Sequence, residues 1–565
     1  MKIIIQKILT DMLVDMGIPD VKPDVDISDT PEHGDYTTNV AMKLSKTLKK
    51  SPMQIGKELQ NRLGKDGALK KAGVEKIEVM PPGFINIFIS NEFLLENLKK
   101  PLLPNNEKKQ TILVEYAQPN THKAFHIGHL RNIITGESVV RLLETDGNHV
   151  IRANYQGDVG LHIAKALYTL LHIPNLKSQI SILKTIQQKT DFLAQAYVSG
   201  NKAYEEDEDA KKEINAINKK IYEKNPDIYP LYEQTRAWSL EYFDLMYTRL
   251  GTHFDRLYFE SDVYTLGKQL VTDGIKKGIF EESDGAVIFP GEKFGLHNRV
   301  FITSEGNPTY EGKDIGLAKL QFGDYHPDTV IHCVSTEQIQ YFNVMFEAIA
   351  RVFPDTRGKE YHLAYGFVQL KSGKMSSRTG NVVLGSWLLD EVKKAMEKII
   401  NEGKREYGDT DNEDIAEKAT IAAIKYAFLK VNTDQEIAFD INESVNITGD
   451  SGPYLLYTYA RCKSVIKKSK GNSQQSAGNS QTLNEEEHAV ARLLLFFPDI
   501  VGSAATNYAP NILCEYLYDL AQAFNLFYAK HTIVGSDTRL TLTQAVADVM
   551  MTGLTLLGIP TVERM

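Results

Sequence analysis

The N-terminal part of the chain combines helix-like and strand-like spacing of apolar residues. The opening MKIIIQKILTDMLVDMG alternates charged and apolar residues as an amphipathic helix does. Further along, VEKIEV and FINIFI have the composition of a strand pair, and the turn signal Pro81-Pro82-Gly83 separates them. Residues 1–105 are therefore predicted to form a small appended α/β domain, which the linker-like stretch PLLPNNEKKQ ends.

After the linker, the continuously apolar run ILVEYA indicates a buried strand that opens a strand–loop–helix–strand unit. The helix is predicted from about Gly128 to Asp146, where Gly147 ends it, and the second strand is VIRANY. Such units form parallel sheets whose ligands lie beyond the carboxyl ends of the strands, where the loop PNTHKAFHIGH falls. The later runs AVIF, TVIHCV and YHLAYGFVQL are predicted to be the second half of the same sheet.

The rest of the pattern completes the domain organisation. Residues 106–390 are predicted to be one α/β domain with a charged helical insertion at about 180–250. From 391 to 565 the pattern is almost wholly helical, apart from the polar low-complexity stretch KKSKGNSQQSAGNSQT. The sequence thus predicts an α/β protein in which a parallel-sheet domain carries an N-terminal α/β domain and a C-terminal all-α bundle.

Composition narrows the class of protein. With 64 basic and 73 acidic residues the net charge is −9, so any nucleic-acid contact must use local patches. The run KLSKTLKK is one candidate, and a solvated helix face is an equal alternative. The three cysteines form no CxxC pair, which argues against a disulfide framework or a structural zinc site. No membrane span and no signal peptide are indicated, so we expect a cytoplasmic protein.

Two short motifs carry the candidate chemistry. The chain lacks GxxxxGK[ST], so ATP would not be held by a P-loop. His126-Ile127-Gly128-His129 instead places two imidazoles at a helix start, where both rings can face one ligand. Much later, the Gly- and Ser-rich stretch KSGKMSSRTGN predicts a cationic loop whose lysine can reach phosphates.

With these motifs in this order, the sequence resembles the class I aminoacyl-tRNA synthetases, whose signatures are a HIGH tetrapeptide and a KMSKS loop on a Rossmann-like fold. Within that class, VEYAQPNTHKAFHIGHLRN, TYEGKDIG, STEQIQYF, YGFVQLKSGKMSSRTGN and LLGIPTVERM resemble the arginine enzymes. HGDYTTNVAMKLSK and PPGFINIFI are similar to the family's N-terminal domain, associated with the tRNA elbow, and the final helices to its anticodon-binding domain. The resemblance implies ATP-dependent activation of L-arginine, its transfer to tRNA(Arg), and Mg²⁺ accompanying the ATP.

The resemblance also implies which residues handle ATP. The expected ATP-binding residues lie in the two motifs and are His126, Gly128, His129, Lys374 and Ser376. The expected catalytic residues are the two histidines, Lys374 and Lys123. Ser377 stands where KMSKS has its second lysine, and by resemblance Lys123, just ahead of HIGH, compensates for that loss. An ordinary solvent-facing lysine is the alternative for Lys123.

A guanidinium group presents five donors in a planar fork, which buried carboxylates and neutral acceptors select best. By resemblance the arginine-binding residues are Glu115, Asn120, Tyr310, Asp314 and Gln338. Turn or core hydrogen bonding is the alternative for Asn120 and Gln338. Two departures from the family bear on this pocket: Tyr341 replaces a family histidine, and Gln118 holds a position that often carries serine.

Two other functions stay open at this point. A sister class I synthetase would want a different pocket, and the acidic pair Glu115 and Asp314 favours arginine over glutamate or glutamine. A catalytically silent paralogue that binds tRNA is the second alternative, motivated by Ser377. Aromatic residues of the C-terminal region either stack on anticodon bases or fill the bundle core. We take a monomer as the default state.

Overall fold

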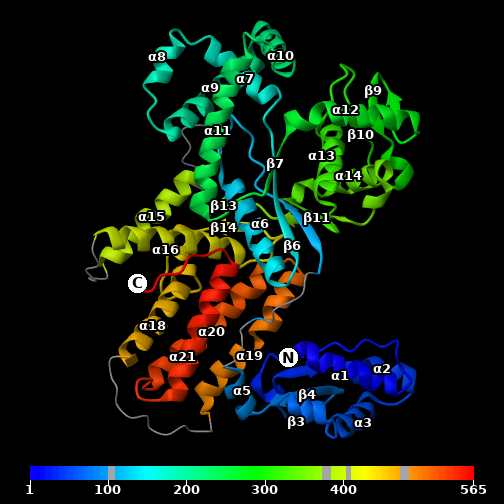
Figure 1. Cartoon of the computed structure of the whole chain (residues 1–565), viewed down its shortest axis with the longest axis vertical. Coiled ribbons are helices and arrows are strands. Elements are labelled where there is room, and N and C mark those ends of the chain that lie inside the picture. The colour runs from blue at the N-terminus through cyan, green and yellow to red at the C-terminus, as the bar shows by residue number, and fades with distance from the viewer. Residues whose placement is uncertain (99–102, 104–108, 372–382, 403–408, 471–482) are drawn as a thin grey trace.

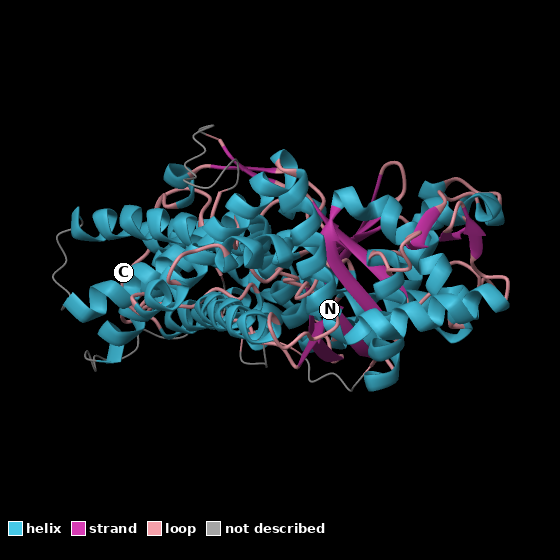
Figure 2. Cartoon of the chain, turned by 90° about the horizontal axis from the view of Figure 1, so that it is seen from above, coloured by secondary structure: helices cyan, strands magenta, loops and turns pink. Residues whose placement is uncertain are grey.

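The computed structural model describes residues 1–98, 103, 109–371, 383–402, 409–470 and 483–565. In Figure 1 the N-terminal part and the helical C-terminal part lie next to each other at the bottom, below the central sheet. Figure 2, which looks down on the molecule from above, shows that the half carrying the C-terminus is mostly helical.

The N-terminal part is an antiparallel sheet of strand order β1-β2-β4-β3 with helices packed against it. Its strands are β1 (Asp26–Ile27), β2 (Tyr36–Thr38), β3 (Val74–Met80) and β4 (Phe84–Ile89). Its helices are α1 (Lys2–Asp15), α2 (Val40–Leu48), α3 (Pro52–Leu63), α4 (Gly67–Lys71) and α5 (Asn91–Asn97). The predicted strand pair is confirmed, because β3 and β4 pair along their length across the Pro-Pro-Gly turn.

The central sheet has five parallel strands in the order β12-β11-β5-β6-β7. They are β5 (Thr111–Glu115), β6 (His149–Gln156), β7 (Arg256–Phe259), β11 (Thr329–Ser335) and β12 (Glu360–Tyr365). The helices around the sheet are α6 (Ile127–Thr145), α12 (Glu260–Lys276), α13 (Tyr310–Tyr325) and α14 (Ile339–Val352). Strand β5 is therefore in the middle of the sheet. The chain adds β6 and β7 on one side of it and later β11 and β12 on the other side.

Alternation along β5 places apolar side chains on both faces of this sheet. Ile112 and Val114 belong to the core that includes α6, whereas Leu113 packs with Val263 of α12 and Leu317 of α13. A parallel strand covered on both faces needs apolar residues at successive positions, which explains the continuous run ILV. The predicted βαβ unit and its parallel sheet are confirmed.

One of the runs predicted to extend this sheet lies elsewhere, and another belongs to it only in part. AVIF forms β9 (Ala286–Phe289), which pairs antiparallel with β8 (Glu281–Ser283) and β10 (Arg299–Ile302) in a separate sheet. The reason is the two-residue turn Asp284-Gly285, whose positive φ angles of 50° and 78° fit a tight antiparallel hairpin.

The long run YHLAYGFVQL is split. Its first part is β12, but β13 (Val368–Leu370) pairs with β14 (Ile437–Phe439) of the following region. Gly366 permits this change of partner, since a Cβ there would lie only 2.2 Å from the carbonyl oxygen of Gln435. The prediction that this run belongs wholly to the central sheet is therefore wrong.

Between β6 and β7 the chain forms a helical insertion, at the top of Figure 1. Its helices are α7 (Leu161–Leu171), α8 (Leu176–Ser181), α9 (Ile186–Glu206), α10 (Glu208–Tyr222) and α11 (Tyr229–Leu250). Ile163, Leu167 and Ile214 are among the residues of a hydrophobic core that belongs to the insertion alone. Asp158, at its entrance, accepts hydrogen bonds from the Ser261 amide (2.9 Å) and from Arg236 Nε (2.8 Å).

The C-terminal region is a helix bundle, as predicted, with β14 as its one strand among the described residues. Its helices are α15 (Gly385–Glu402), α16 (Asp409–Leu429), α17 (Ile441–Ser444), α18 (Gly452–Lys470), α19 (Glu485–Thr506), α20 (Pro510–Lys530) and α21 (Asp537–Leu556). Within the described ranges, α19 alone is long and apolar enough to cross a membrane by length and composition. It packs against α20, α21 and α6 as the core helix of a bundle does.

The same helix α19 holds the N-terminal part. Arg492 donates from Nε to Asp35 at 2.9 Å and from Nη2 to the carbonyl oxygens of Ser28 and Gly34 at 2.8 and 3.0 Å. All of these contacts are buried, and Tyr36 adds a 2.9 Å hydrogen bond to Asp499. The N-terminal part is thus docked through polar contacts that are closed to water.

Candidate active site

The loop that joins β5 to α6 has an unusual backbone. Ala117, Gln118 and His122 have φ angles of 76°, 47° and 62°, a region that residues other than glycine rarely adopt. Side chains of the neighbouring elements fix it, since the Ala117 amide donates to Asn132 Oδ1 at 2.6 Å and the Gln118 amide to Asn154 Oδ1 at 3.1 Å. Such concentrated strain is typical of functional loops that the surrounding structure holds in place.

At the end of this loop, His126 caps α6 and its ring stacks on that of His129, with centroids 3.8 Å apart. Nδ1 of His126 accepts the Gly128 amide and Nδ1 of His129 accepts the His126 amide, each at 3.1 Å. A neutral ring that accepts at Nδ1 carries its proton on Nε2, so both rings offer an Nε2–H donor. A Cβ on Gly128 would come within 2.9 Å of the His126 ring, which explains the glycine.

Electrostatics keep both imidazoles neutral near pH 7. Burial, together with the positive charge of Lys123, lowers the pKa of His126 to about 4. Burial and the neighbouring His126 lower the pKa of His129 well below its usual value. The pair therefore presents neutral donors at a helix N-terminus, where backbone amides favour an anion.

Glu115 ends β5 and is buried. Its Oε1 accepts Gln118 Nε2 at 2.6 Å, its Oε2 accepts Gln321 Nε2 at 2.7 Å, and Nδ1 of His332 lies 3.3 Å from the same Oε2. Burial alone would raise the pKa of Glu115, but His332 and the two amides outweigh burial and hold that pKa below its usual value. Glu115 is thus an ionised carboxylate inside the protein.

Asp314 lies on α13 and lines the same small cavity as Glu115. Tyr341 donates its hydroxyl to Asp314 Oδ2 at 2.6 Å. Burial raises the pKa of Asp314 to about 7, and the Tyr341 hydrogen bond opposes that rise. The two carboxylates differ, because Glu115 has a cationic neighbour of its own and Asp314 has only a neutral donor at hydrogen-bond distance.

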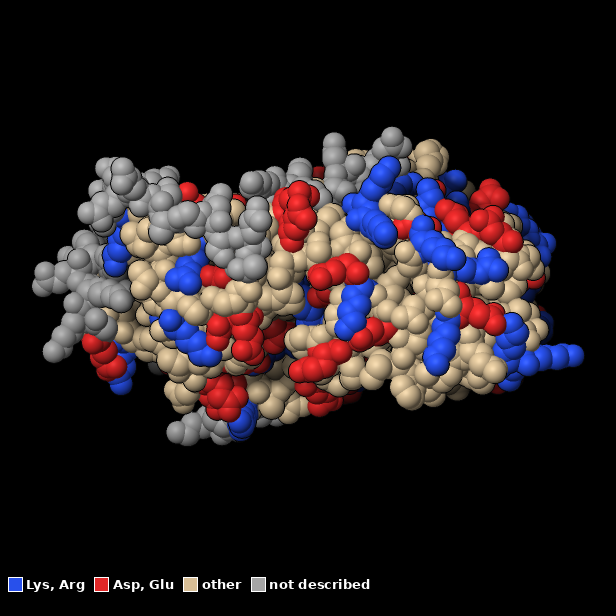
Figure 3. Space-filling view, turned by 90° about the horizontal axis from the view of Figure 1, so that it is seen from below, with Lys and Arg blue, Asp and Glu red and all other residues tan. Residues whose placement is uncertain are grey.

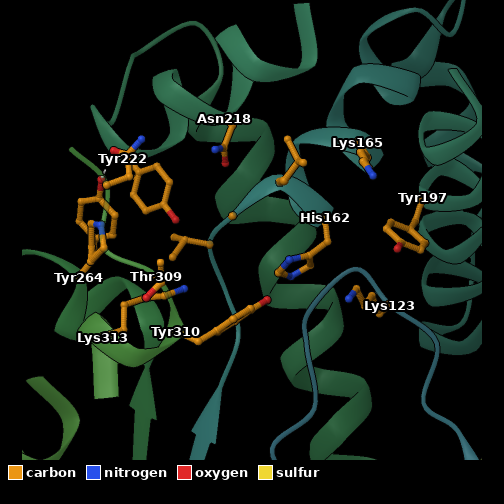
Figure 4. Close-up of a pocket in the computed structure, with 15 residues that line it drawn as sticks. Lys123, His162, Lys165, Tyr197, Asn218, Tyr222, Tyr264, Thr309, Tyr310 and Lys313 are labelled. Atoms are coloured by element: carbon orange, nitrogen blue, oxygen red, sulfur yellow. Dashed lines mark hydrogen bonds between the residues drawn. The ribbon is translucent and has the colours of Figure 1, made fainter. Parts of the chain in front are cut away.

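A larger cavity, of about 490 Å³, opens between the insertion and the start of α13 (Figure 4). Lysines and tyrosines dominate its lining: Lys123, Lys165, Lys313, Tyr197, Tyr222, Tyr264 and Tyr310. Figure 4 shows the side chains of Lys165 and Tyr197 on one side of the cavity, with Tyr222 and Tyr264 opposite them. The rings of that second pair stack at 4.2 Å. The cavity therefore combines positive charge with flat aromatic surfaces.

The structure brings some of the predicted site residues together in two cavities and places others outside them. Glu115 and Asp314 share one cavity, and Lys123 and Tyr310 share the other. Asn120 bridges to Gly157 at the end of β6, with its side chain against that glycine. Gln338 is exposed at the end of a short 3-10 helix before α14 and lines neither cavity. Lys374 and Ser376, like Ser377, lie outside the described residues.

Several residues around Glu115 and Asp314 were not singled out from the sequence as site residues. They are Gln321, His332 and Glu360, all lining the small cavity. The signal for His332 was present, because it is a titratable residue inside the otherwise apolar run TVIHCV. Among the described residues, no group of three or more His, Cys, Asp or Glu side chains is arranged to hold a metal ion.

The parallel sheet and the paired histidines at the start of α6 are the features of a class I aminoacyl-tRNA synthetase, and the family "tRNA synthetases class I (R), catalytic domain" matches residues 91–441. The families "Arginyl tRNA synthetase N terminal domain" and "DALR anticodon binding domain" match residues 1–89 and 455–565. The chain belongs to the arginyl-tRNA synthetase family.

Relatives and solved structures agree with this assignment. The arginine–tRNA ligase of Flavobacterium psychrophilum is 31% identical over 94% of each chain, and that of Treponema denticola is 31% identical over 99% of each. The Thermus thermophilus arginyl-tRNA synthetase structure has a TM-score of 0.83 at 25% identity and covers 100% of both chains. The predicted fold class, family and activity, the ATP-dependent attachment of arginine to tRNA, are confirmed.

Proposed function

We propose that Glu115 and Asp314 bind the guanidinium group of L-arginine in the cavity they share. The observation that carries this proposal is the convergence of two carboxylates on one enclosed space. Oε1 of Gln321, next to them, is buried and has no hydrogen-bond partner within the described residues. A guanidinium offers five N–H donors, which suits carboxylates together with a free neutral acceptor.

We propose that His126 and His129 act on ATP. Their Nε2–H groups donate to phosphate oxygens as the arginine carboxylate attacks the α-phosphorus and pyrophosphate leaves. ATP enters as its Mg²⁺ complex, and Gly128 leaves room for the nucleotide. Lys374 and Ser376 are assigned to the phosphates by resemblance alone. Lys123 is assigned the charge that the second lysine of KMSKS supplies in other class I enzymes.

We further propose that the cavity of about 490 Å³ receives the 3′ end of the tRNA. Aromatic faces stack on bases and lysines pair with phosphates, and this cavity offers both. Tyr310, which is 59% exposed, lies at its edge and at the N-terminus of the helix that carries Asp314. Tyr310 therefore contacts the arginine and the tRNA end together. Asn120 and Gln338 are assigned to the amino-acid head group or the pocket wall by resemblance alone.

The remaining tRNA contacts follow the domain division 1–105, 106–390 and 391–565. In Figure 3 Lys and Arg side chains are frequent on the side where the N-terminal part lies, and we assign this surface to the tRNA elbow. Near the C-terminus, the guanidinium of Arg461 lies 4.7 Å from the ring of Tyr457 and 4.9 Å from that of Tyr528, beside a cavity. We assign this cavity to an anticodon base. We expect the enzyme to be a cytoplasmic monomer.

The test is aminoacylation of unfractionated tRNA with each of the twenty amino acids, ATP and Mg²⁺. We expect the wild type to charge arginine alone. Glu115→Gln and Asp314→Asn should each raise the arginine KM by about tenfold or more, the effect of losing ~1.4 kcal/mol of binding. Glu208→Gln on α10 removes an exposed carboxylate outside both cavities and is the matched control. Charging of another amino acid, or an unchanged KM in both pocket variants, would contradict the pocket assignment.

A further inference from the structure

One imidazole lies between two buried carboxylates behind the proposed arginine pocket. His332 is paired in register with Glu115 of β5, and its Nδ1 lies 3.3 Å from Glu115 Oε2. Its Nε2 lies 3.5 Å from Oε1 of Glu360, which begins β12. The side chains of all three residues are buried, so water does not screen these contacts.

The imidazole has little freedom to move away. The rings of Phe342 and Phe346 on α14 lie 5.2 and 5.7 Å from that of His332 and close one side of it. Within the described residues, neither His332 Nε2 nor Glu360 Oε1 has a hydrogen-bond partner. The nearest oppositely charged atom to each of these two atoms is therefore the other one, 3.5 Å away. A neutral imidazole would leave both carboxylates without a cation at this place.

We propose that His332 is a positioning residue for arginine binding: as an imidazolium held between Glu115 and Glu360, it fixes the Glu115 carboxylate and keeps it ionised before arginine enters. The proposal rests on the assigned role of Glu115 in the arginine pocket. Its physical basis is that a buried carboxylate without a cation takes up a proton instead. A carboxylate that is already charged and oriented binds the guanidinium without further rearrangement.

The electrostatics of the cluster agree with this geometry. Burial would lower the pKa of His332, but Glu115 and Glu360 outweigh burial and raise that pKa to about 10. The other titratable groups around the cluster include His362 of β12, Asp314 of α13, Tyr341 of α14, Tyr155 of β6 and Cys333 of β11. The pKa of His362 is lowered by burial, so this ring is neutral and supplies no second cation.

The proposal has a pH signature that a purely structural role lacks. In the wild type, Asp314 is the pocket carboxylate that titrates near neutrality, at about pH 7. As the pH falls below 7, the logarithm of the arginine Kd should therefore increase, approaching one unit for each pH unit. Without the imidazolium, burial raises the pKa of Glu115, so a second proton competes with arginine as the pH falls.

The experiment is titration calorimetry of L-arginine into the full-length enzyme from pH 6 to 8.5. His332→Asn keeps a donor toward Glu115 but has no charge, and it should raise the Kd about tenfold at pH 8. In this variant the logarithm of the Kd should increase more steeply below pH 7, approaching two units for each unit by which the pH falls. Glu360→Gln removes the second carboxylate and should raise the Kd by a smaller factor. His362→Asn, on the neighbouring strand, is the matched control and should follow the wild type.

The arginine Kd of His332→Asn and its dependence on pH decide the outcome. If His332→Asn retains a slope of one and a Kd within about twofold of the His362→Asn control, the proposal is overturned. If His332→Asn does not fold, Glu360→Gln decides, and an unchanged Kd there overturns the proposal. Glu115→Gln distinguishes a failure of the arginine-pocket assignment from a failure of the proposed role of His332. An unchanged Kd in that variant removes the pocket assignment itself, whereas a raised Kd with a normal His332→Asn removes only the role of His332.

Discussion

Asp314 provides the sharpest prediction, because the carboxylate that we propose binds arginine also destabilises the empty enzyme when it is ionised. Burial raises its pKa from 3.8 to about 7. At ~1.4 kcal/mol for each pH unit between these values, the ionised form costs on the order of 4 kcal/mol. The folded protein holds the proton where the unfolded chain has released it, so the cost is absent near pH 4 and complete above about pH 7.

Asp314→Asn removes this charge and keeps an acceptor for the Tyr341 hydroxyl. We expect the variant to melt at a higher temperature than the wild type at pH 8, by about 3 °C for a chain of this length, with the difference vanishing as the pH falls toward 4.5. Arginine binding should change in the opposite sense and be weakened at every pH. In the wild type, the Kd for arginine should rise about tenfold between pH 8 and pH 6, since protons compete for one carboxylate whose pKa is about 7.

The assays are thermal unfolding followed by fluorescence and calorimetric titration of arginine, each over the same pH series. Glu208→Gln on α10 is the control, because that carboxylate is exposed and paired with Lys211 at the surface, and its removal should change the unfolding free energy by less than ~1 kcal/mol. A variant less stable than the wild type at pH 8, or an arginine Kd in the wild type that is independent of pH between 6 and 8, would refute the reasoning.

Two further predictions concern the histidine pair and the N-terminal docking. His129→Asn retains an acceptor for the His126 amide but lacks Nε2–H, so single-turnover aminoacylation should slow by ~10²–10³-fold with the arginine Kd unchanged. An equal loss in arginine affinity would show a different role. Arg492→Met leaves Asp35 buried without a cation and should lower the free energy of urea unfolding by ~3–5 kcal/mol. Removing the exposed Lys50 by Lys50→Met is the control and should cost below ~1 kcal/mol.

The sequence predicted what depends on local pattern. The run ILVEYA, the helix after it and VIRANY lie where the continuous apolar runs and Gly147 predicted them. AVIF was misplaced because a short apolar run has the same appearance in a parallel and in an antiparallel sheet. Only the Asp284-Gly285 turn, with two positive φ angles, distinguishes the antiparallel arrangement from the parallel one.

The residues of the candidate site were predicted from the resemblance to a family. The pattern of apolar and polar residues does not predict which of them lie close together. Glu115 and Asp314 are far apart in the sequence, and nothing in it says that they line one cavity. His332 occupies a strand position that looks like ordinary core, and its importance comes from Glu360, on the next strand of the sheet. Such clusters depend on strand order, which periodicity does not fix.

The insertion has a consequence for how the protein folds. It separates β6 from β7, which are hydrogen-bonded neighbours, by about a hundred residues, and closing a loop of that length costs a few kcal/mol of chain entropy. Because the insertion has a hydrophobic core of its own, it can form first and bring its two ends together. The contacts of Asp158 with Arg236 and Ser261 then join those ends to the sheet. We expect the edge strand β7 to pair late, and only after the insertion has folded.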